Sequence, residues 1–101
     1  MIKITPEQLK IVAEILSKHV PGAQVRAFGS RVNGTPKPYS DLDLAIIAGK
    51  KLDIASLGAL REAFAESDLP FRVDIIDWHS TSLQFKKIVE AGYEAIILPK
   101  T

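Results

Sequence analysis

Apolar residues recur at helical spacing in three segments of the chain, and a residue that favours a helix N-terminus precedes each segment. Thr5 precedes the first, followed by Pro at the first helical position and Gln three residues after Thr5, which is a capping-box pattern. Asp53 precedes the second, and Ser80 or Ser82 precedes the third. Pro or Gly follows each segment, so we expect three helices that end at these breakers. The apolar positions are Leu9, Val12, Ala13, Leu16 and Val20, then Ile54, Leu57, Leu60, Ala63 and Phe64, and finally Leu83, Phe85, Ile88 and Val89.

Four short apolar stretches lie between and after these segments and predict strands. They cover residues 24–28, 41–47, 71–77 and 94–98, and Pro99 should end the last of them. The order is therefore helix, strand, strand, helix, strand, helix and strand. This order predicts an α/β or α+β domain built on one sheet.

The first strand leads into Gly29 and Ser30, and a loop from Arg31 to Ser40 with one Gly and two Pro separates it from the second strand. Gly allows backbone N–H groups to approach a phosphate closely, and a Ser hydroxyl adds a donor. A single helical turn just after Ser30 would add free N–H groups and a positive dipole end. The alternative is an ordinary turn at a strand end. Arg31 either contacts phosphate or lies in solvent, and the sequence leaves both open.

Two carboxylates open the second strand. Because successive side chains of a strand alternate between its faces, Asp41 and Asp43 point the same way, about 6.6 to 7 Å apart along the backbone. Like charges at this spacing favour a divalent cation between them, and Mg²⁺ binds such oxygen ligands together with substrate phosphates. Otherwise this is a strand start near solvent, with one Asp capping a turn.

A third carboxylate, Asp74, lies in the middle of an otherwise apolar strand. Such a group is costly there unless it binds a metal or pairs with a cation, for which Arg26 and Arg72 are the candidates. If the second and third strands are neighbours, Asp74 lies beside Asp41 and Asp43. Three carboxylates around one point are enough for two Mg²⁺ ions about 3.5 to 4 Å apart, one for an attacking hydroxyl and one for a triphosphate.

Composition and charge narrow the class of protein. The chain has 101 residues, which suits one small domain over residues 1–101, and 13 basic against 12 acidic residues give no strong signal for nucleic-acid binding. Cys is absent, which excludes disulfides and thiolate metal sites. We find no signal-peptide pattern and no apolar run of the ~20 residues that a membrane helix needs, so we expect a cytoplasmic protein without a membrane partner.

Gly-Ser, ten residues, Asp-x-Asp and a third Asp on a later strand form a pattern that resembles the DNA polymerase beta type nucleotidyltransferase superfamily. The pattern is most similar to its smallest members, the minimal nucleotidyltransferases, some of which serve as the antitoxin of a HEPN toxin pair. The resemblance covers most of the chain, and none of the matching positions departs from the pattern. The matching segments are residues 29–31, Gly34, residues 40–44, residues 73–77 and residues 85–92.

The resemblance implies a fold, an activity and a set of site residues. The fold would be a single mixed sheet with helices packed on one face. The activity would be Mg²⁺-dependent transfer of AMP from ATP to an acceptor hydroxyl, which in the toxin pairs is a tyrosine of a HEPN-type helical toxin encoded nearby. The site residues would be Asp41, Asp43 and Asp74 as catalytic metal ligands, and Gly29, Ser30, Arg31 and Ser40 as nucleotide-binding residues.

The acceptor is the part of this reading that the sequence leaves open. The second domain with which larger relatives bind the base and the acceptor is missing, so a partner chain would supply part of the site. One alternative is a non-catalytic antitoxin that neutralises its partner by contact. Another is transfer to a small molecule such as an aminoglycoside, although about 100 residues leave little room for the concave pocket that a small acceptor needs. A domain of this size also allows a homodimer, which nothing in the sequence demonstrates.

Overall fold

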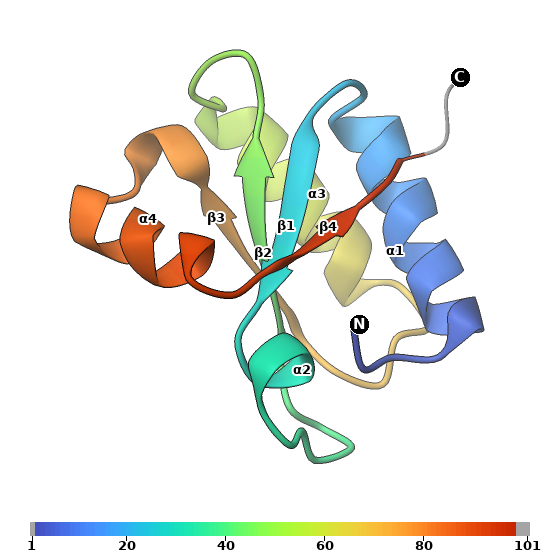
Figure 1. The fold of residues 1–101 in the computed structure, drawn as a ribbon. Helices are drawn as coiled ribbons and strands as arrows, with labels where there is room; N and C mark the ends of the chain where they lie inside the picture. The colour runs from blue at the N-terminus through green and yellow to red at the C-terminus, as the bar shows by residue number, and fades with distance from the viewer. Residues whose placement is uncertain (1, 99–101) are drawn as a thin grey trace.

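Figure 1 shows the computed structural model of the chain, which describes residues 2–98. Its strands are β1 (Gln24–Phe28), β2 (Leu42–Ile47), β3 (Val73–Asp77) and β4 (Glu94–Ile96). They form one sheet in the order β3-β2-β1-β4. β1 pairs antiparallel with β2 and β4, whereas β2 and β3 are parallel, so the sheet is mixed, as the family resemblance implied. Pro99, expected to end the last strand, lies outside the described residues.

The helices begin at capping residues that the sequence marks. Thr5 makes both hydrogen bonds of the expected capping box with Gln8. Asp53 caps the next long helix, and of the two serines considered for the last helix, Ser82 is the cap. A single helical turn does follow Gly29. The helices are α1 (Pro6–His19), α2 (Ser30–Asn33), α3 (Ile54–Ala65), the 3-10 turn η1 (Trp78–Ser80) and α4 (Leu83–Glu90).

The core lies between the sheet and the helices α1 and α3. Leu42 and Leu44 of β2 are fully buried against Leu16 of α1 and Leu60 of α3. Because side chains alternate along a strand, burying the two leucines turns Asp43 to the other face of the sheet. The hydrophobic pattern thus places a carboxylate on the face away from the core.

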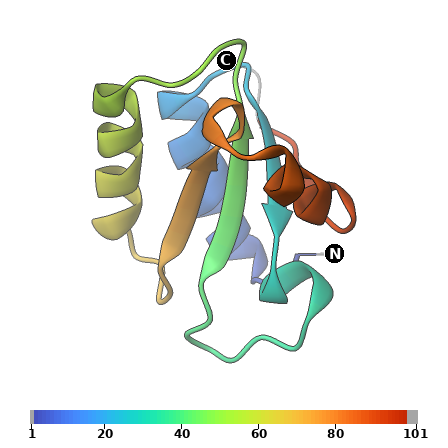
Figure 2. The ribbon, with the colours of Figure 1, turned by 90° about the vertical axis from the view of Figure 1, so that its left-hand side faces the viewer.

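The helix α4 packs on the face of the sheet that carries Asp43. Figure 2 shows α1 and α3 on one side of the sheet and α4 on the other. The ring of Phe85 meets the ring of Phe28 edge-on, with centroids 5.7 Å apart, and Phe28 is directly opposite Asp43 in the β1–β2 register. The expected packing of helices on one face therefore describes α1 and α3 only. α4 departs from it because its apolar stripe finds a partner at Phe28.

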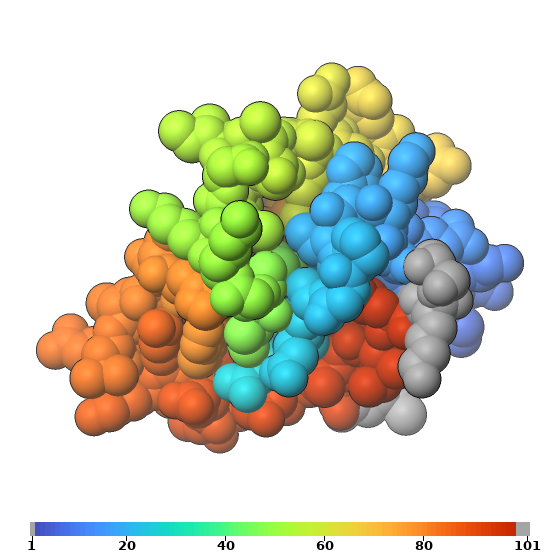
Figure 3. Space-filling view, turned by 90° about the horizontal axis from the view of Figure 1, so that it is seen from above, coloured from blue at the N-terminus to red at the C-terminus, as the bar shows by residue number. Residues whose placement is uncertain are grey.

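The other end of the sheet is covered by loops. From above, in Figure 3, the segment between β2 and α3 (green) lies beside the chain that enters β1 (blue), in line with the pairing of Gln24 with Ile47. The carboxylates lie at the opposite end, where β1 finishes and β2 and β3 start. Within residues 2–98, no helix is both long and apolar enough to cross a bilayer.

Candidate active site

The parallel pairing of β2 with β3 brings two of the predicted carboxylates together. Asp43 and Asp74 are direct partners in the register, so their side chains lie on the same face of neighbouring strands. Asp41 directly precedes β2, and its charge acts on Asp43 as well. The prediction that the second and third strands are neighbours, with Asp74 beside the Asp-x-Asp segment, is therefore confirmed for Asp43.

Asp43 is the carboxylate whose ionisation the fold opposes most clearly. Burial of its side chain and, to a smaller extent, the charges of Asp74 and Asp41 raise the pKa of Asp43 to about 6, while the charge of Arg72 acts against them. An anion held among other anions would be relieved by a cation. The electrostatics of this end of the sheet thus favour a positively charged ligand beside Asp43.

Gly29 has no side chain, and this leaves space for the carboxylate of Asp43. Its backbone has φ 81° and ψ −158°, a conformation that side chains other than Gly rarely adopt. A Cβ at this position would also lie 2.3 Å from Oδ2 of Asp43. α2 begins at the next residue, the exposed Ser30. The predicted Gly-Ser turn is thus directly beside the predicted carboxylates, as a triphosphate site requires.

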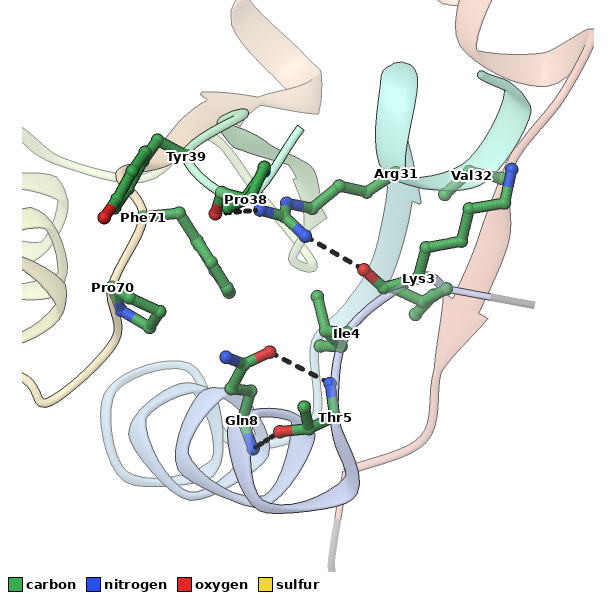
Figure 4. Close-up of a pocket in the computed structure, with 11 residues that line it drawn as sticks. Lys3, Ile4, Thr5, Gln8, Arg31, Val32, Pro38, Tyr39, Pro70 and Phe71 are labelled. Atoms are coloured by element: carbon green, nitrogen blue, oxygen red, sulfur yellow. Dashed lines mark hydrogen bonds between the residues drawn. The ribbon is translucent and has the colours of Figure 1, made fainter. Parts of the chain in front are cut away.

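The structure contradicts one of the two sequence interpretations of the Arg31 side chain. It is 5% exposed, and its guanidinium lies over the ring of Phe71, 4.2 Å from the centroid. Nε donates to the carbonyl oxygen of Ser40 at 2.9 Å. Nη1 donates to the carbonyl oxygen of Lys3 at 2.9 Å, and Nη2 to that of Pro38 at 3.0 Å (Figure 4). The interpretation as a solvated side chain is wrong. The guanidinium holds the 31–40 loop against the N-terminal segment, so it does not point freely at a phosphate.

Ser40 also serves the loop that precedes the carboxylates. Its carbonyl accepts the bond from Arg31, and its Oγ accepts a hydrogen bond from the backbone N–H of Lys37 at 2.9 Å. These contacts fix the chain just before Asp41. A direct contact of Arg31 or Ser40 with nucleotide stays a prediction, because in this structure both residues bind the loop instead.

The two arginines considered as partners of Asp74 have other partners in the described part of the chain. Nη2 of Arg72 lies 3.1 Å from Oδ2 of Asp41, in an exposed ion pair. The guanidinium of Arg26 lies over the rings of Trp78 and Tyr93, 5.2 and 4.4 Å from their centroids. The ion-pair interpretation of Asp74 is therefore not what the structure shows.

The donor chemistry of this site suits a hard divalent cation. Among residues 2–98, no three His, Cys, Asp or Glu side chains are arranged to hold a metal ion by themselves, and Asp41 is paired with Arg72. Mg²⁺, however, is usually bound by one or two carboxylates together with substrate phosphates and water. Asp43 and Asp74, opposite each other in the register, provide two such ligands. The residues present therefore fit Mg²⁺ that arrives with a nucleotide.

Sequence reasoning missed a contact that connects α2 to the chain after α4. Nδ2 of Asn33 donates to the carbonyl oxygen of Gly92 at 2.8 Å, and a Cβ on Gly92 would lie 2.6 Å from that nitrogen. Positive φ angles occur only at Gly22 and Gly29 among the described residues, so Gly92 is not a left-handed helix stop. It is small because Asn33 lies against it. A Gly after a helix has several explanations, so the sequence held no specific signal for this contact.

The sequence profile described as a nucleotidyltransferase domain matches residues 9–98. The chain is a nucleotidyltransferase domain. This assignment confirms the family resemblance and agrees with the mixed sheet described above.

Known relatives of the nucleotidyltransferase domain include a curated protein and several solved structures. The chain is 52% identical over 95 residues to a probable protein adenylyltransferase MntA from Haemophilus influenzae, covering 94% of this chain and 83% of the relative. A crystal structure of a toxin–antitoxin with AMP-PNP superimposes with a TM-score of 0.77 at 26% identity, over 90% of this chain and 73% of that one. A tri-AMPylated HEPN toxin in complex with MNT antitoxin, from Shewanella oneidensis, gives 0.71 at 24% identity, over 92% and 71%.

Proposed function

We propose that this nucleotidyltransferase transfers AMP from ATP, with Mg²⁺, to a hydroxyl of a partner protein, and that it thereby acts as an antitoxin. The observation that carries the proposal is the register that sets Asp43 opposite Asp74, next to the Gly29–Ser30 turn. On one side this arrangement provides carboxylate ligands for a cation. On the other side it provides hydrogen-bond donors for the phosphates of a nucleotide. Phosphoryl-type transfer needs mainly positioning and charge neutralisation, so few further side chains are required.

Each residue of the site has a defined task in this reaction. Asp43 and Asp74, joined by Asp41, would hold Mg²⁺, which supplies charge neutralisation and a lowered pKa for the attacking hydroxyl. Gly29 leaves space beside Asp43, and the hydroxyl of Ser30 donates to the phosphates. Asp74 belongs to the edge strand β3, so it is the carboxylate best placed to orient the acceptor and to receive its proton.

The partner is inferred from the relatives of this chain. The solved structures similar to this chain include toxin–antitoxin complexes, one of them with an ATP analogue. The similarity to a protein adenylyltransferase extends over nearly the whole chain. We infer that the acceptor is a HEPN-type toxin encoded nearby and that the attacking group is a tyrosine hydroxyl.

The deciding experiment incubates the protein with labelled ATP, Mg²⁺ and the toxin encoded beside it, and follows label and mass on the toxin. The Asp41→Asn/Asp43→Asn double variant is the test, and Asp68→Asn, an exposed carboxylate outside the site, is the matched control. A mass gain of one or more AMP units with wild type and control, absent with the double variant, supports the proposal. A stable, inhibited complex without label on the toxin would instead establish an antitoxin that acts by contact.

A further inference from the structure

The loop before β2 presents a tyrosine to solvent. Tyr39 is 79% exposed, whereas Tyr93, the other tyrosine of the chain, is 41% exposed. The ring of Tyr93 is also covered by the guanidinium of Arg26, whose central carbon lies 4.4 Å from the ring centroid. Within residues 2–98, the hydroxyl of Tyr39 has no hydrogen-bond partner. Of the two tyrosines, Tyr39 is therefore the more accessible phenol.

A β-turn fixes the backbone at Tyr39. The N–H of Ser40 donates to the carbonyl oxygen of Lys37 at 3.0 Å, and the N–H of Lys37 donates to Oγ of Ser40 at 2.9 Å. Pro38 and Tyr39 are the two central residues of this turn, and Pro is favoured at the first of these positions because its φ is fixed. The buried guanidinium of Arg31 donates to the carbonyl oxygens of Lys37 and Pro38. A side chain on a turn held in this way loses little backbone entropy when it enters another site.

The hydroxyl of Tyr39 is directed away from the carboxylates of its own chain. Figure 4 shows the Tyr39 ring beside Phe71, with the hydroxyl pointing away from Arg31. Tyr39 and Phe71 line a cavity of about 750 Å³ together with Gln8 of α1. α1 lies on the face of the sheet opposite to Asp43. The hydroxyl is thus placed to enter the site of a second copy and not that of its own chain.

The turn and the site lie at the same end of the molecule. Tyr39 comes shortly before β2, at whose start Asp43 lies opposite Asp74. In a pair of copies related by a twofold axis, a loop that reaches the partner's site receives the partner's loop in return. Charge favours this contact, because residues 31–40 include no acidic residue and the exposed Lys37 would approach the carboxylates of the other copy.

We propose that Tyr39 is itself an acceptor for AMP, adenylylated at its hydroxyl by the site of a second copy. This inference rests on the proposed function and adds an acceptor on the antitoxin to the one on the toxin. The phenolic oxygen of Tyr39 forms a bond to the α-phosphorus of ATP held by the other copy. The bond from that phosphorus to the oxygen bridging the β-phosphate breaks, pyrophosphate leaves, and the hydroxyl proton passes to Asp74 of that copy. Because the toxin and Tyr39 compete for one site, self-transfer is greatest where toxin is absent.

Mixing two variants tests the transfer between copies. Asp43→Asn, which lacks a proposed metal ligand, carries a polyhistidine tag and serves as the acceptor, while untagged Tyr39→Phe serves as the enzyme. With labelled ATP and Mg²⁺ and no toxin, we expect label on the tagged chain, and peptide mass spectrometry should locate the AMP on Tyr39. An Asp43→Asn/Tyr39→Phe acceptor should lose the label, and the matched Asp43→Asn/Tyr93→Phe acceptor should keep it. Equal labelling of these two acceptors would overturn the proposal.

The neighbouring toxin separates this inference from the proposed function. Tyr39→Phe should label the toxin at the wild-type rate, because the Tyr39 hydroxyl is outside the proposed metal and nucleotide site. Toxin added to wild type should lower the label on Tyr39, since both acceptors need the same site. Label on the toxin with none on Tyr39 would overturn self-transfer and leave the proposed function intact. Absence of label from both chains would contradict both proposals.

Discussion

The carboxylate of Asp43 occupies the space that a side chain on Gly29 would need, because a Cβ there would lie 2.3 Å from Oδ2 of Asp43. The backbone turn at Gly29, after β1, and the position of the Asp43 carboxylate in the proposed metal site therefore depend on each other. A residue larger than Gly at position 29 must displace the carboxylate, the turn or both.

Gly29→Ala should accordingly damage both stability and activity. Alanine at φ 81° is strained, and its methyl group meets Asp43, so we expect a loss of about 1 to 3 kcal/mol in the free energy of unfolding. The matched control is Gly58→Ala, which lies within α3 with no atom near its Cβ position and should be stabilising by up to about 1 kcal/mol. Urea denaturation measures both variants. Equal stability of Gly29→Ala and wild type would show that the turn adapts freely.

The metal-free protein should become more stable when Asp43 is made neutral. The pKa of Asp43 is about 6 in the folded chain against an ordinary 3.8, so the folded state disfavours its ionised form. Wild type therefore loses stability as the pH rises from about 4 to about 6 and does not regain it above that range. Asp43→Asn avoids this loss. At pH 7 to 8 its free energy of unfolding should exceed that of wild type by about 1 kcal/mol, which is less than the full pKa shift would give because solvent partly screens the half-buried carboxylate.

Urea denaturation in EDTA between pH 4 and pH 8 checks this expectation, with Asp68→Asn as the control. The advantage of Asp43→Asn should disappear near pH 4, where both proteins are neutral at this position. Adding Mg²⁺ with an ATP analogue should stabilise wild type more than the variant, since the variant lacks a carboxylate ligand. An advantage that is the same at every pH would indicate that packing, not charge, is responsible.

The variant that is more stable should also be the less active one. Asp43→Asn and Asp74→Asn each remove one of the paired carboxylates, and we expect a fall of about a thousandfold in the rate of AMP transfer. Their circular dichroism should match that of wild type, because neither side chain contributes to the core. Transfer at a near-normal rate by both folded variants would place the chemistry elsewhere on the molecule.

Arg31 should prove to be a structural residue whose guanidinium a lysine cannot replace. Its three nitrogens donate to four carbonyl groups, at Lys3, Lys37, Pro38 and Ser40, in the planar geometry of a guanidinium. Arg31→Lys should lose two or more of these bonds, costing about 2 to 3 kcal/mol, and should expose the loop to trypsin at Lys37. Arg72→Lys, at an exposed ion pair, is the matched comparison and should change stability by less than about 1 kcal/mol. Wild-type resistance of Arg31→Lys to trypsin would argue against this role.

Local patterns predicted the elements of the fold well. The cap at Thr5, the cap at Asp53 and the apolar alternation around Asp43 each depend on residues close in the sequence, and the structure confirms all three. The pairing of β2 with β3 had to be assumed, because a parallel register depends on packing between distant segments. Once that pairing exists, the meeting of Asp43 and Asp74 follows from the alternation alone.

The failures at the site share a physical cause. For Arg31 the sequence left phosphate contact and a solvated side chain open, and the carbonyl groups that bury it come from segments that only the folded chain assembles. The contact of Asn33 with Gly92 gave no signal either, since it joins segments that lie far apart in the sequence.

The central place of β1 in the sheet also bears on how the chain folds during synthesis. Val25 pairs with Ile46 on one side and with Ile96 on the other, so the two partners of one strand are separated by about half of the sequence. The β1–β2 hairpin can form early, but its outer edge stays open until β4 has left the ribosome. Closure of this edge by β4 should therefore be the late step of folding. A chain still attached to the ribosome would expose an unpaired strand beside an already formed Gly29–Ser30 turn.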